Sequence, residues 1–88
     1  MKQLIINAQA ILSKEDLYRM INEELKLPEW QGNNLDALWD TLSVWNEPLQ
    51  IIVEHQYLLL AVLGQYGQNF LELLDDLAEE NSNITIQS

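Results

Sequence analysis

Residues 27–40 read LPEWQGNNLDALWD, a stretch that joins a loop to the start of a helix. Pro28 disfavours helical backbone before it, and glycine and asparagine are typical of turns, so we predict a loop up to Asn33. Asn34 then has the chemistry of a helix N-cap. The predicted helix carries leucines at i, i+3 and i+7, which are Leu35, Leu38 and Leu42.

Two aspartates and three tryptophans surround this helix. Asp36 and Asp40 lie off the leucine line and four residues apart, so they project side by side from its outer face, at a cost of roughly 0.2–0.5 kcal/mol to the isolated helix. Trp30, Trp39 and Trp45 flank them. Large aromatic side chains beside charged groups are typical of protein interfaces, so the segment is a predicted binding face. For Trp45 a place in the core is an equal alternative.

Outward from this segment, the sequence predicts a regular alternation of strands and helices. A capping box beginning at Ser13 starts a helix whose apolar stripe runs to residue 27. The segment 57–63, closed by Gly64, is apolar nearly all round and predicts a short buried helix. A last helix is expected around residues 70–78. Short apolar runs predict three strands, at residues 4–6, 49–53 and 84–86.

This order of elements defines a fold class. Strand, two helices, strand, two helices and strand is the pattern of an α/β protein with a three-stranded parallel sheet and about four helices packed against it. We expect buried strands, with helices covering most of both sheet faces. The 88 residues are enough for a single domain over residues 1–88.

The charge of the chain is distributed unevenly. Residues 1–26 carry four basic and four acidic side chains, whereas residues 27–88 carry ten acidic ones and no lysine or arginine, which accounts for the whole net charge of −10. Such a protein repels nucleic acid and anionic membranes and attracts basic partners. Solubility alone is the alternative reason for this acidity.

Several kinds of chemistry find no support in the sequence. The chain has no cysteine, no phosphate-binding glycine motif and no calcium-loop spacing, so we predict no cofactor and no metal site. Asp36 and Asp40 lack the histidine or lysine that acid–base catalysis usually needs, and His55 is expected at the surface, so a small hydrolase ranks last. Without a signal sequence or membrane span, a cytoplasmic location is expected.

Residues 27–40, together with Trp45, Pro48 and the closing run 84–86, resemble the barstar family over essentially the entire chain. The resemblance implies a protein that is not an enzyme: an antitoxin that inhibits a basic, barnase-type extracellular ribonuclease inside the cell that makes it. It also implies a monomer that forms a 1:1 complex. The alternative is a barstar-like module that regulates another basic protein or toxin.

The resemblance assigns roles to individual side chains. Asp40 would enter the phosphate site of the enzyme, Asp36 would meet a neighbouring arginine, and Trp30 would pack over the catalytic histidine in place of a tyrosine of barstar. Asp76, on the last helix, would take the place of an interfacial glutamate, and Val44 stands where barstar has glycine. The predicted partner-binding residues are Trp30, Gly32, Asn34, Leu35, Asp36, Trp39, Asp40, Trp45 and Asp76.

Overall fold

The computed structural model describes residues 2–27 and 33–88. Its elements follow the predicted order, with one short addition after the first strand. In chain order they are β1 (Lys2–Asn7), the 3-10 helix η1 (Ala8–Ala10), α1 (Lys14–Leu25), α2 (Leu35–Leu42), β2 (Leu49–Glu54), α3 (Gln56–Leu63), α4 (Gln65–Glu80) and β3 (Ile84–Gln87).

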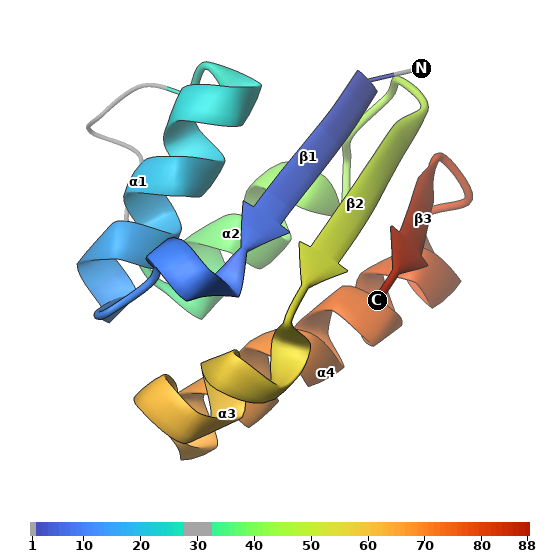
Figure 1. The fold of residues 1–88 in the computed structure, drawn as a ribbon. Coiled ribbons are helices and arrows are strands. Elements are labelled where there is room, and N and C mark those ends of the chain that lie inside the picture. Colours follow the sequence, from blue (N-terminus) through green and yellow to red (C-terminus); the bar gives the residue numbers. More distant parts are fainter. Residues whose placement is uncertain (1, 28–32) are drawn as a thin grey trace.

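The three strands form one parallel sheet in the order β1-β2-β3. Leu4 lies opposite Ile51, and Ile51 lies opposite Ile86, so the apolar runs of the three strands are in register. Helices α2 and α4 lie behind this sheet in the view of Figure 1. The predicted α/β class, with four helices and a three-stranded parallel sheet, is confirmed.

In the part of the chain that the structure describes, helices cover only one face of the sheet, so the prediction of two covered faces was wrong. Along β1 and β2 burial alternates: Leu4 and Ile51 are buried, whereas Ile5 is 40% exposed on the opposite face. On that open face the side chain of Gln3 donates to Gln50 (3.0 Å), which donates in turn to Gln87 (3.0 Å). Alternation of polar and apolar residues is the pattern of a half-exposed strand. Because residues 4–6 are all apolar, the sequence of β1 did not reveal this alternation.

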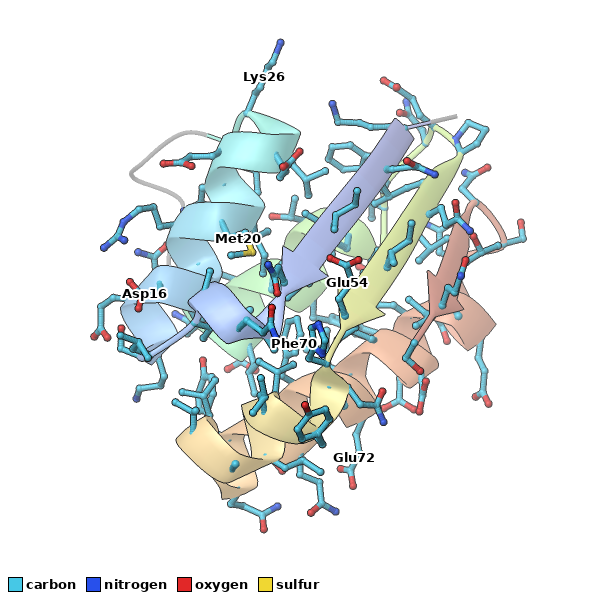
Figure 2. The ribbon with its side chains drawn as sticks, viewed as in Figure 1. Asp16, Met20, Lys26, Glu54, Phe70 and Glu72 are labelled. Carbon is cyan, nitrogen blue, oxygen red and sulfur yellow. The ribbon has the colours of Figure 1, made fainter. Side chains whose placement is uncertain are left out.

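The core lies between the sheet and helices α1, α2 and α4. Phe70 of α4, labelled in Figure 2, is fully buried and belongs to the same apolar core as the buried residues of the three strands. The predicted stripe of α1 is confirmed, because its members, Leu17, Ile21 and Leu25, are all buried. Complete burial of a large apolar side chain stabilises the fold by roughly 1.5–3 kcal/mol.

Helix α1 begins as predicted. The hydroxyl of Ser13 accepts a hydrogen bond from the backbone N–H of Asp16 (3.2 Å), and the carboxylate of Asp16 accepts one from the N–H of Leu12 (2.9 Å). That backbone bond, together with Arg19 at 3.0 Å, lowers the pKa of Asp16 below its usual value. The helix ends at Leu25, and its C-cap residue, Lys26, has its backbone in the left-handed conformation (φ 56°).

Helix α3 is largely exposed, so its predicted burial was wrong. Within α3, which the structure describes completely, Leu59 alone is buried. Tyr57, Leu60 and Val62 are 63%, 42% and 43% exposed. The helix packs by one side against α4, where a Cβ atom on Gly67 would lie 2.4 Å from the carbonyl oxygen of Leu59. An apolar composition therefore did not produce burial on every side of this helix.

Candidate protein-binding site

Helix α2 is held at its start by the predicted N-cap. The side-chain oxygen of Asn34 accepts a hydrogen bond from the backbone N–H of Ala37 at 2.8 Å. Leu38 and Leu42 are buried beneath the helix, and Leu35 is half-buried and packs against the core. The leucine stripe thus fixes which face of α2 points to solvent.

The outward face of α2 carries its two aspartates. Asp36 and Asp40 are both exposed, as the spacing predicted. Trp39 is half-buried and packs against the core, which leaves part of this residue at the surface. Asp36 lies in the first turn, where the partial positive charge of a helix N-terminus stabilises a carboxylate.

A groove of about 380 Å³ separates α2 from α4. Its walls carry three carboxylates: Asp36 comes from α2, and Glu72 and Asp76 come from α4. The remaining lining residues are Leu35, Trp39, Asn69 and Leu73. The groove therefore combines apolar surface with acidic walls, which suits the aliphatic stem and charged head of a lysine or arginine side chain.

No basic side chain offsets these acids. All four lysines and arginines of the chain belong to residues 1–26, and none of them lines the groove. Figure 2 shows Lys26 at the opposite end of the molecule from Glu72, and Arg19 is paired with Asp16 at 3.0 Å. The groove is therefore a site of unbalanced negative charge, which favours a cationic partner.

The predicted site residues are brought together in part. The structure places Leu35, Asp36, Trp39 and Asp76 in one groove, whereas Asp40 is exposed on α2 but is not among the residues that line it. Trp30 and Gly32 lie outside the described residues. Trp45 is partly buried against the core, and its indole N–H is buried without a hydrogen-bond acceptor in the described structure. Most of the Trp45 side chain therefore faces the protein interior.

Glu72 is a groove residue that the sequence analysis missed. Asn69, Glu72, Leu73 and Asp76 follow one another at i, i+3, i+4 and i+7, so they share a single face of α4. The amide of Gln68 donates a hydrogen bond to the carboxylate of Glu72 at 3.2 Å. Glu72 precedes Asp76 by four residues, about one helical turn, so this spacing could have identified it as a neighbour of Asp76.

Two further classes of site find no support in residues 2–27 and 33–88. Over these ranges no three His, Asp or Glu side chains are grouped so that they could hold a metal ion. In the same part of the chain, no helix is both long enough and apolar enough to cross a membrane.

The fold and the acidic groove define a small α/β protein with a face suited to a basic partner. Comparison with known families shows that the chain belongs to the family described as Barstar (barnase inhibitor), whose model matches residues 1–87. The chain is also 32% identical, over 81 residues, to the protein of Bacillus subtilis (strain 168) named "Putative ribonuclease inhibitor YrdF". That match covers 91% of this chain and 89% of the relative. Family membership supports a role as a ribonuclease inhibitor.

Proposed function

We propose that this chain is an antitoxin that inhibits a basic, barnase-type extracellular ribonuclease by occluding its active site. Each chain would bind one enzyme molecule and protect RNA in the cell before the enzyme is exported. The chain itself would catalyse no reaction. The observation that carries this proposal is the acid-walled groove, because it joins Asp36 and Trp39 of α2 to Asp76 of α4 on one surface.

The chemistry of ribonucleases favours an acidic inhibitor. An enzyme that binds RNA must concentrate positive charge around the phosphate that it cleaves. Carboxylates on a folded helix can occupy such a pocket, and they present no phosphodiester bond to be cut. A chain with net charge −10 would also be drawn to a basic enzyme over long range.

Within this proposal Asp40 is the chief anchor. It would take the place of an RNA phosphate, while Asp36 would pair with a neighbouring arginine. The groove beside them would receive a further basic side chain between Trp39 and Asp76, with Glu72 as an additional acid on the same wall. A guanidinium group can stack on an indole ring and pair with carboxylates at the same time.

A ribonuclease assay with barnase, titrated with the parent protein and with charge-matched variants, tests the proposal. The parent should abolish RNA cleavage at a 1:1 ratio. Asp40→Asn should weaken inhibition by about 30-fold or more, because losing one partner of a buried charge pair costs about 2–5 kcal/mol, a range for which barnase and barstar are a known example.

Glu79→Gln and Glu80→Gln serve as controls that remove the same charge elsewhere. Both side chains are exposed at the end of α4 and lie outside the groove. Each control should weaken inhibition less than threefold, because exposed charges contribute mainly to screened, long-range attraction. Equal losses for all three substitutions would show that only diffuse charge matters and would contradict the anchoring role of Asp40.

A second candidate function is the regulation of a different basic protein by the same face. Val44 favours it, because this residue is 76% exposed two positions after the end of α2, where barstar has glycine. Such a branched side chain changes the shape of the rim that a partner must fit. A pull-down from the source cell separates the two functions, since the first predicts a ribonuclease in the bound fraction and the second predicts a basic protein without this activity.

A further inference from the structure

We infer that Asn81 is a positioning residue of this binding face: it fixes helix α2 relative to helix α4 and so sets where the aspartates of the two helices lie. The predicted effect of Asn81 on binding rests on the proposed function. Its structural part stands independently, because it concerns the arrangement of the two helices in the free protein.

The side chain of Asn81 is an unusual feature of the core. It is only 9% exposed, among residues that are otherwise apolar, at the point where α4 ends. Its amide nitrogen donates to the carbonyl oxygens of Leu42 (3.1 Å), Ser43 (3.4 Å) and Trp45 (2.8 Å). One side chain therefore connects the end of α4 to the end of α2 and to the turn that follows it.

The other polar groups of Asn81 are also satisfied. Its side-chain oxygen accepts from the N–H of Asn83 (3.0 Å), and its backbone N–H donates to Leu77 of α4 (2.8 Å). The amide of Asn83 then donates to Trp45 as a second connection (3.2 Å). Because a buried and fully paired amide is held in one orientation, this network defines the position of the α2 terminus.

The carbonyls that Asn81 binds lie at the end of α2 and in the turn that follows it, and the backbone N–H of Trp45 also donates to the carbonyl of Leu42 at 3.2 Å. The last carbonyls of a helix have no partner within the helix, and α2 has no basic residue in its last turn. Asn81 adds side-chain N–H donors to these carbonyls from the C-cap position of α4.

The groove depends on the same arrangement. Its acids come from both helices, with Asp36 on α2 and Asp76 on α4, and a partner cation must reach both sides at once. If α2 pivots on its buried leucines, the distance between the two walls changes while the net charge of the chain does not. The dissociation rate of a complex should therefore depend on Asn81, and the electrostatically driven association rate should not.

The test compares the parent with Asn81→Ala, and with Ser82→Ala as a control at an exposed neighbour in the same turn. We expect residual dipolar couplings of backbone amides to show a changed or averaged angle between α2 and α4 in Asn81→Ala, with the couplings of the sheet unaltered. Dissociation from the ribonuclease should become about tenfold faster or more, and association should stay within about twofold. Ser82→Ala should match the parent in both measurements.

A double-mutant cycle adds a measurement that a loss of stability alone would not move. Asp76→Asn should weaken binding less in the Asn81→Ala background than in the parent, because the groove is already displaced. The inference would be overturned if Asn81→Ala left the angle between α2 and α4 unchanged. It would also be overturned if the effects of Asn81→Ala and Asp76→Asn on binding were additive and Asn81→Ala left the dissociation rate unchanged. If the parent binds no ribonuclease, the proposed function fails and the helix angle alone decides the role of Asn81. If Asn81→Ala does not fold, Asn83→Ala, which removes only the second connection, should show smaller changes in the same direction.

Discussion

Gly67→Ala tests how closely α3 and α4 approach each other. Alanine is favoured over glycine inside a helix by about 1 kcal/mol, so helix propensity alone predicts a more stable protein. Gly67 is buried within α4, and an added Cβ atom would lie 2.4 Å from the carbonyl oxygen and 2.8 Å from the carbonyl carbon of Leu59. Both distances are below the 3.0 Å that real Cβ contacts essentially never undercut, and both atoms belong to the backbone. The helices must therefore separate.

Overpacking of this kind costs about 2–3 kcal/mol, so we expect a net loss of about 1–2 kcal/mol after the gain in propensity. That loss should lower the melting temperature by roughly 5–15 °C. Urea and thermal unfolding, followed by tryptophan fluorescence and circular dichroism, measure both quantities. Gln68→Ala, at an exposed neighbour on the same helix, should change stability by less than about 0.5 kcal/mol. An increase in stability for Gly67→Ala would refute the close packing of α3 on α4.

Three further predictions concern pH, the burial of α3 and salt. The lowered pKa of Asp16 means that its contribution to folding is present above about pH 4 and is lost as the pH falls through the folded pKa. The stability gap between the parent and Asp16→Asn should therefore shrink as the pH falls below about 4 in urea titrations. Leu59→Ala should lower the free energy of unfolding by about 2–5 kcal/mol, and Leu60→Ala should lower it by less than about 1 kcal/mol, both measured by urea titration. Equal losses would contradict the one-sided packing of α3. Raising the salt concentration from about 50 to about 200 mM should slow association with the ribonuclease several-fold and change dissociation less than about twofold in stopped-flow and surface-binding measurements.

Much of the fold could be predicted from local signals. The leucine stripe of α2, the N-cap at Asn34 and the capping box at Ser13 each place a helix correctly, because a single turn of backbone determines them. The parallel sheet followed from the order of elements, since crossovers between parallel strands need intervening helices. These features depend on residues close together in the chain.

The burial of whole elements could not be predicted in the same way. The segment 57–63 has the composition of a buried helix, yet Leu59 is its only buried residue, and Leu58 and Leu63 are partly buried against the core. Burial depends on which other elements are present to cover a helix. The isoleucine at residue 5 interrupts the alternation of β1 and makes its open face resemble a buried one. Apolar composition shows which segments can be buried, whereas the elements that pack against a segment determine whether it is buried.

The candidate site shows the same division. Asp36, Trp39 and Asp40 could be grouped from the sequence because they share one short helix. The groove that Asp36 and Trp39 share with α4 joins segments about thirty or more residues apart, and only the resemblance to barstar had pointed to Asp76. Nothing in the sequence around Asn81 identifies its bonds to the end of α2. Long-range polar contacts of this kind leave no periodic pattern.

The most direct test of the account is amide hydrogen exchange of the chain alone and in complex with barnase or its own ribonuclease. We predict protection on binding over residues 33–45 and on the groove face of α4 between Asn69 and Asp76, with little change on α3 or on the open face of the sheet. Protection confined to α3 or to the open sheet face, with α2 exchanging as in the free protein, would contradict the claim that the aspartates of α2 enter the active site of the enzyme.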